Sequence, residues 1–300
     1  QVETISGRLG VDLKIVDLKA RFQKIVLDYF IDSYKSGKTP NPCMICNREI
    51  KCGHFHEHIL STGLDAMATG HYVQCRETDG YPALFQGVDP RKDQSYFLAR
   101  LTVEQLGKLR FPLGSRHKEH TYEFMEAHGF SDFRGKESQD VCFLKDSTVS
   151  EFLSDKLGSS IAAGSIVTVD GKEIGRHQGL HRYTVGQRRG LGLPDHTPWY
   201  VCALDARTNQ LIVGKNEHLN TRVLTAVAPH WLVPAPPGHG DRFTVKIRST
   251  HAGAMATITD IDRTLLAVEF DQPQRAISPG QYAVLYHRNQ VIGSAEIIAS

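Results

Sequence analysis

The first half of the chain alternates short apolar runs with segments of helical periodicity. Apolar residues recur at helical spacing over residues 20–38, and a second helix is expected over residues 47–60. The runs 11–18 and 64–73 are apolar enough to form short strands. Strands that alternate with helices predict a parallel sheet with helices on both faces.

Beyond about residue 145 the pattern changes to short strands. One more helix is expected over residues 150–157, and a hairpin follows it with Asp170 and Gly171 as the turn. Strand-like runs continue to the end of the sequence: WYVCALDA, QLIVG, RFTVKIRST, ATITDIDR, LLAVEF and QYAVLYH. Several short strands at regular spacing are typical of a small barrel or sandwich. A further boundary is expected near residue 218.

Composition and charge exclude few classes of protein. The 300 residues are 40% hydrophobic and 23% charged, with a formal net charge of +2, which is ordinary for a soluble protein. The sequence has no apolar run of the roughly 18–20 residues that a membrane-spanning helix needs, and no visible signal peptide. A basic run over residues 176–190 holds four arginines and no acidic residue, which suits either RNA contact or a solvated loop.

Closely spaced cysteines are the first candidate for chemistry. Cys43 and Cys46 lie in TPNPCMICN (39–47), where two prolines keep the backbone extended and delay the next helix until near Cys46. A thiol near a helix N-terminus is favoured as the thiolate, which is the nucleophilic form. Zinc binding is the main alternative, because the two cysteines have ligand spacing and Cys52 and three histidines follow. A purely structural role is the third.

Two other motifs are ambiguous by themselves. MATGHYV places Gly70 and His71 where a strand meets a loop, a position where sites gather in parallel sheets. A histidine there more often has a structural role. ESQDVCFL surrounds Cys142 with apolar residues, so a half-buried cysteine in a strand is the plainer interpretation.

The segment KDQSYFL is also open to two interpretations. Its charged and polar residues precede an apolar helix, which Asp93 or Ser95 would cap in the simpler interpretation. A functional role for these residues would need support from elsewhere in the chain.

Taken as a whole, the sequence resembles the bacterial and mitochondrial tRNA-specific 2-thiouridylases. The resemblance is carried, in this order, by TPNPCMICNREIK, MATGHYV, KDQSYFL, ESQDVCFL, HQGLHRYTVGQRRGLGL and SPGQYAVLY. It runs from the first residues to the last. It implies an ATP-pyrophosphatase-type parallel α/β domain over 1–145, a small central β-rich domain over 146–218 and a C-terminal β-barrel that contacts tRNA over 219–300.

The resemblance also implies an activity and its residues. Sulfur would be transferred to C2 of the wobble uridine of tRNA after ATP, used with magnesium, adenylates the C2 oxygen. Cys142 would carry a persulfide received from a sulfur-relay protein, Cys46 would be its partner thiol, and Gly70 would contact ATP. The residues implied to contact tRNA are Asn41, Pro42, Cys43, His71, Lys92, Asp93, Gln94, Arg248, Ser249 and Gln281. The protein would act as a cytoplasmic monomer.

Three departures from the family pattern keep alternatives open. The phosphate-binding SGGVDS loop of the family is not among these 300 residues, so we expect either further sequence before Gln1 or a tRNA-binding paralogue without catalysis. Cys43 stands where some relatives have Asp, which allows an iron–sulfur cluster on Cys43, Cys46 and Cys142. Cys52 replaces an aromatic residue and has no functional explanation.

Overall fold

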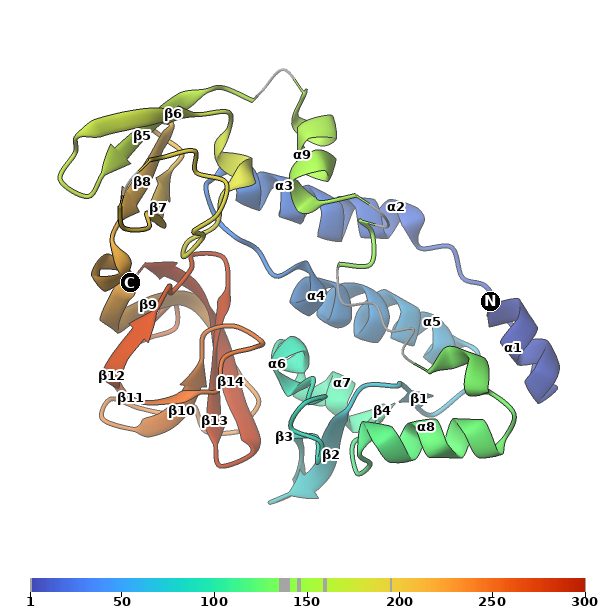
Figure 1. Cartoon of the computed structure of the whole chain (residues 1–300). Helices are drawn as coiled ribbons and strands as arrows, with labels where there is room; N and C mark the ends of the chain where they lie inside the picture. The colour runs from blue at the N-terminus through green and yellow to red at the C-terminus, as the bar shows by residue number, and fades with distance from the viewer. Residues whose placement is uncertain (1, 135–140, 145–146, 159–160, 195, 300) are drawn as a thin grey trace.

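The structure, a computed structural model, describes residues 2–134, 141–144, 147–158, 161–194 and 196–299. Three parts lie against one another (Figure 1): an N-terminal part of helices and short strands, a small central sheet, and a C-terminal barrel. Within the described part of the chain, no helix combines the length and the apolar character needed to cross a membrane.

Helices make up most of the N-terminal part. They are α1 (Val2–Leu9), α2 (Lys19–Phe22), η1 (Gln23–Leu27), α3 (Asp28–Lys35), α4 (Pro42–Ile45), η2 (Cys46–Phe55), α5 (His56–Ser61), α6 (Ser95–Leu98), α7 (Val103–Gly107), α8 (Lys118–Ala127) and η3 (Ser131–Phe133). The helix predicted over residues 20–38 is confirmed as the continuous run α2–η1–α3. The second helix begins at Pro42, earlier than predicted, because proline is well suited to the first helical position.

The strands of the N-terminal part are shorter than predicted. The parallel pair consists of β1 (Met67–Ala68) and β4 (Leu109–Arg110), so only two residues of the run 64–73 form a strand there. The strand predicted over residues 11–18 is wrong: these residues are irregular, mostly exposed, and paired with no described strand. An apolar run cannot persist as a strand without a neighbour to satisfy its backbone groups. The parallel α/β character itself is confirmed.

The C-terminal part is a closed barrel, as expected. Its strands are β9 (Asn220–Trp231), β10 (Arg242–Lys246), β11 (Ala254–Ile261), β12 (Leu265–Arg275), β13 (Tyr282–His287) and β14 (Gln290–Ala299). They follow the order β13-β10-β11-β12-β9-β14, and pairing of β13 with β14 closes the ring. Buried side chains such as Leu224, Val268, Phe270 and Leu285 fill the interior. The sequence patterns did not predict β9 and β14.

The central part is a four-stranded sheet next to one helix. Its elements are α9 (Val149–Leu157), β5 (Gly164–Thr168), β6 (Glu173–His177), η5 (Leu180–Arg182), β7 (Tyr200–Asp205), β8 (Gln210–Gly214) and η6 (Asn216–Leu219). The strand order is β6-β5-β8-β7, with β5 and β8 parallel. The predicted hairpin turn is confirmed, and Gly171 adopts the positive φ (83°) that such a turn requires. The helix predicted over 150–157 is confirmed as α9.

The N-terminal part and the barrel share one hydrophobic core. Leu98 and Leu106 belong to the same buried cluster as Tyr282, Tyr286 and Val291 of the barrel. A hairpin of β2 (Val73–Thr78) and β3 (Tyr81–Gln86) extends the barrel sheet, because β3 pairs with β14. The two parts are therefore joined by apolar contacts and by strand pairing.

Candidate active site

The N-terminal end of the segment that carries Cys43 and Cys46 is fixed by hydrogen bonds within the helix and to the barrel. Asn41 caps the helix, its side-chain oxygen accepting a hydrogen bond from the Met44 amide at 3.3 Å. Just before this helix, Gln281 of the barrel donates through Nε2 to the carbonyl of Thr39 at 2.8 Å. The amide of Thr39 in turn donates to the Pro279 carbonyl at 2.8 Å. The barrel therefore fixes the loop that leads into the cysteine helix.

Because the helix starts at Pro42, the two cysteines sit deeper in it than the sequence indicated. Cys43 lies in the first turn, and Cys46 lies one turn further along at the start of η2. The predicted thiolate-favouring position near the N-terminus therefore belongs to Cys43, and the prediction for Cys46 is wrong. Cys46 is only 8% exposed.

Burial dominates the acidity of both thiols. It raises the pKa of Cys46 to about 11, against a lowering by the nearby charge of Lys51 and smaller increases from Cys142 and Cys43. Burial also raises the pKa of Cys43, with a further increase from Cys142 and an opposing effect of Lys51. Both side chains are therefore thiols at neutral pH in this conformation.

Cys142 lies in an exposed turn and not in a strand, so the half-buried interpretation of its motif is wrong. The next residue anchors this turn: the ring of Phe143 packs edge-on against Phe30 (centroids 5.2 Å apart) and Phe22 (6.0 Å). Phe143 also packs against the cluster that contains Cys46. Residues 137–140, the first part of this motif, lie outside the described residues.

These contacts bring together thiols that are far apart in the sequence. Cys142 lies 96 residues after Cys46 (142 − 46). It is nevertheless close enough for its charge to raise the pKa of both Cys46 and Cys43. The aromatic contacts of Phe143 explain this proximity physically, because they fix the turn beside the cysteine helix. One buried thiol, one half-buried thiol and one exposed thiol thus share a site.

Lys51 is a residue of this site that the sequence motifs did not single out. Its positive charge lowers the pKa of Cys43 and of Cys46, and it also acts on the ring of His71. At α-helical spacing, residues five apart face different directions. In η2, however, the wider π-type turn brings positions i and i+5 closer, so only the observed geometry relates Lys51 to Cys46.

Gly70 and His71 follow β1 at the edge of the parallel pair. Gly70 is exposed, and a side chain there would meet only Leu113 Cδ1 at 3.9 Å, which leaves open space beside the backbone. Nδ1 of His71 is 2.9 Å from the Thr69 hydroxyl. Burial, helped by the charge of Lys51, lowers the pKa of His71 to about 4. His71 is therefore a neutral imidazole at physiological pH.

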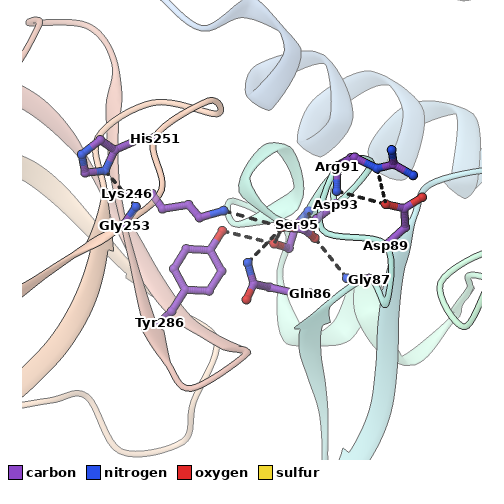
Figure 2. Close-up of polar contacts among 10 residues, drawn as sticks. All are labelled: Gln86, Gly87, Asp89, Arg91, Asp93, Ser95, Lys246, His251, Gly253 and Tyr286. Atoms are coloured by element: carbon purple, nitrogen blue, oxygen red, sulfur yellow. Dashed lines mark hydrogen bonds and ion pairs between the residues drawn. The ribbon is translucent and has the colours of Figure 1, made fainter. Parts of the chain in front are cut away.

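The Lys92–Gln94 segment lies next to this edge. Gln94, and neither Asp93 nor Ser95, is the residue at the N-cap of α6, and its side chain does not cap the helix. It instead accepts a hydrogen bond from the Tyr72 amide at 2.9 Å. Asp93 lies at the centre of a hydrogen-bond cluster that reaches the barrel (Figure 2).

The barrel contributes the remaining predicted contacts. Arg248, Ser249 and Gln281 line a cavity of about 470 Å³ together with Thr39 of the N-terminal part and Thr184 of the central part. Arg248 donates to the carbonyl of Arg275, another cation of the same cavity, at 3.3 Å. The described lining has two arginines and no acidic residue, which suits an anionic ligand.

The metal-binding alternatives gain no support. All six cysteines are described, and within the described ranges no group of three or more His, Cys, Asp and Glu side chains is placed to hold a metal ion. Cys43, Cys46 and Cys142 are thus close enough to interact through charge without forming a ligand set. Cys52, which had no explanation, is fully buried in the shared core, where burial raises its pKa to about 12.

Comparisons with known proteins agree with this architecture. Three family models match in succession: a tRNA methyl transferase HUP domain over residues 1–146, a tRNA methyl transferase PRC-barrel domain over 150–215 and an aminomethyltransferase β-barrel domain over 221–297.

Similar curated proteins carry one name. A protein of Desulfotalea psychrophila named tRNA-specific 2-thiouridylase MnmA is 50% identical over 300 residues, covering 99% of this chain and 87% of its own length. Proteins of the same name from Syntrophotalea carbinolica and Magnetococcus marinus are each 41% identical, covering 96% and 98% of this chain and 82% of their own lengths. The chain therefore belongs to the tRNA-specific 2-thiouridylase family.

Proposed function

We propose that this chain transfers sulfur to C2 of the wobble uridine in tRNA and consumes ATP in doing so. The observation that carries the proposal is the meeting of Cys46 and Cys142, which come from segments far apart in the sequence. The relatives are named as tRNA-specific 2-thiouridylases, which supports thiolation of uridine in tRNA. A site with two thiols of different exposure suits a reaction in which one cysteine receives sulfur and the other completes the exchange.

In the proposed reaction, ATP first adenylates the C2 oxygen of the uridine and makes it a leaving group. The exposed Cys142 attacks the outer sulfur of a persulfide on a donor protein, takes that sulfur as its own persulfide and releases the donor's cysteine as a thiol. The outer sulfur then attacks C2 and displaces AMP. The thiolate of Cys46 attacks Sγ of Cys142, so that the two cysteines end as a disulfide and the sulfur stays on the uridine. A thiol reductant restores both thiols.

The binding residues are proposed by their positions around this pair. Gly70 is the proposed ATP contact, because the exposed backbone beside it leaves room for a nucleotide. The phosphates of that nucleotide would bind the magnesium ion. Asn41, Pro42 and Cys43 would lie against the target base, next to His71. The Lys92–Gln94 segment would face the RNA, while Arg248, Ser249 and Gln281 would hold its backbone through the cationic cavity.

We further propose the division into domains at residues 1–145, 146–218 and 219–300. The central sheet ends with β8 at Gly214 and the barrel begins with β9 at Asn220, which supports the second boundary. The protein would act as a monomer in the cytoplasm, with tRNA and a sulfur-relay protein as partners.

The test is the formation of 2-thiouridine in tRNA by variants of the intact protein, measured by mass spectrometry of RNA digests. Cys46→Ser and Cys142→Ser should each abolish the product. Cys202→Ser is the matched control, since this half-buried thiol lies in β7 of the central sheet, and it should retain activity. Full activity of either of the first two variants would exclude the mechanism.

A second readout separates the persulfide from the cluster alternative. Protein loaded with sulfur should gain about 32 Da, one sulfur atom, in a form that a thiol reductant removes and that Cys142→Ser lacks. Stoichiometric iron with acid-labile sulfide, lost in Cys43→Ser, would instead support a cluster on the three cysteines. Binding of tRNA without any thiolation would favour a non-catalytic paralogue.

A further inference from the structure

Asp93 is a buried carboxylate whose oxygen atoms are fully engaged by the protein. It lies in the loop between β3 and α6, and its side chain is only 4% exposed. Oδ1 accepts hydrogen bonds from the amides of Gly87 (3.1 Å) and Ser95 (3.0 Å). Oδ2 accepts from Gln86 Nε2 (3.1 Å) and the Ser95 hydroxyl (2.8 Å), as Figure 2 shows. These four bonds use the acceptor capacity of a carboxylate.

The barrel reaches this carboxylate with a cation. Nζ of Lys246, at the end of β10, lies 3.8 Å from Oδ2 of Asp93, and its side chain is only 15% exposed. Beside it, the hydroxyl groups of Tyr286 and Ser95 are 3.2 Å apart (Figure 2). An ion pair that is shielded from water on both sides is screened by salt much less than a surface pair.

The two members of this pair belong to the two surfaces that the proposed function assigns to tRNA. Next to Asp93, Gln94 makes two hydrogen bonds to the backbone of Tyr72. Its side-chain Oε1 accepts from the Tyr72 amide (2.9 Å), and its backbone amide donates to the Tyr72 carbonyl (3.1 Å). Tyr72 directly follows the proposed nucleotide and base contacts Gly70 and His71. On the barrel, Lys246 precedes Arg248 by two residues, a short distance from the cationic cavity.

We propose that Asp93 and Lys246 form a positioning pair, which holds the tRNA-contacting edge of the barrel in register with the loops around Gly70 and His71. Within the segment proposed to face the RNA, the side chain of Asp93, only 4% exposed, thus acts on tRNA through this pair and not as the direct contact that the family resemblance implies. A carboxylate with four hydrogen bonds has no acceptor site left for a hydrogen bond from RNA. The negative charge of Asp93 would also repel the RNA phosphates. This inference rests on the proposed function, since it assigns how two parts of the same site are aligned.

The test separates positioning from contact by the salt dependence of tRNA binding. A cation that contacts a phosphate contributes about 0.7–0.9 to the slope of log K against log salt concentration. Arg248→Met, two residues away on the same edge, is the matched control and should lower the slope by about that amount. Lys246→Met should leave the slope as in the wild type.

Loss of the positioning pair should lower the rate of thiolation. With tRNA saturating, Asp93→Asn and Lys246→Met should each slow single-turnover thiolation by on the order of tenfold or more, because small displacements of reacting groups are costly. The double variant should be no slower than the slower single variant, since each change alone already removes the pair. It also leaves no unpaired buried charge, so it tests the idea even if a single variant folds poorly.

Two results would overturn the inference while leaving the proposed function intact. One is a lower salt slope for Lys246→Met, equal to that of Arg248→Met, which would make Lys246 a phosphate contact. The other is a double variant whose loss of rate is the product of the two single losses, which would make the residues independent. Absence of both tRNA binding and thiolation in the wild-type protein would refute the proposed function, and the inference with it.

Discussion

Cys46 should react slowly with alkylating reagents at neutral pH, even though it is the proposed partner thiol of Cys142. Burial raises its pKa to about 11 from an ordinary value of 9.0, and the charge of Lys51 offsets this only in part. Well below both values, a thiol with the higher pKa has about one hundredth of the thiolate of an ordinary cysteine. Since the thiolate is the reacting form, the rate of alkylation should fall by the same factor.

The assay is pulsed labelling with iodoacetamide between about pH 7 and pH 11, with each cysteine followed by mass spectrometry of its peptide. The rate at Cys46 should rise about tenfold per pH unit across this range, because its titration is not complete below pH 11. The exposed Cys142 should be labelled first. Repeating the series in Cys142→Ser removes one of the charges that raise the pKa of Cys46. A rate at Cys46 that levels off by about pH 9 would refute the reasoning from burial.

Three further changes have definite expected results. Lys51→Met removes a charge that lowers the thiol pKa values, so labelling of Cys43 and Cys46 at fixed pH should slow down. The pKa of His71 is about 4 in the folded state, below its value of 6.5 in the unfolded state. Between these two pH values the unfolded state therefore binds more protons than the folded state. The free energy of unfolding should fall by up to about 3 kcal/mol as the pH drops from 6.5 to about 4. Urea denaturation of His71→Gln at several pH values should lack this component. Gln281→Ala removes the donor to the carbonyls of Thr39 and Pro40 and should cost about 1–3 kcal/mol in urea denaturation, whereas an unchanged midpoint would mean that the barrel does not hold the loop.

Local signals predicted those elements that local chemistry determines. The turn at Asp170 and Gly171 was predictable because few residue pairs adopt the backbone of a tight hairpin. The helix α2–η1–α3 was predictable because its apolar residues recur on one face. The two prolines predict a later start for the next helix than the structure shows, because proline breaks a helix in its interior but is favoured at its first position, where Pro42 lies.

Features that depend on distant partners could not be predicted from patterns. The apolar run 11–18 is not a strand, because strand formation depends on a neighbour and not on the run alone. The sequence pattern does not predict β14, because Gly293 interrupts its apolar run, yet its backbone pairs with three other strands. The meeting of Cys46 and Cys142 depends on Phe143 in an aromatic cluster. The family resemblance supplied that pair, while spacing along the chain carried no information about it.

The position of β14 has a consequence for the order in which a newly made chain can fold. β3 pairs with β14 through Phe85 and Gln290, which are 205 residues apart in the sequence (290 − 85). At about 5–20 residues per second, the ribosome needs about 10–40 s to produce that partner after β3 has emerged. Until then, Val73 and Leu84, which end in the core shared with the barrel, have no complete surface to pack on. The nascent N-terminal part must therefore persist as an incompletely packed intermediate until β14 has been made.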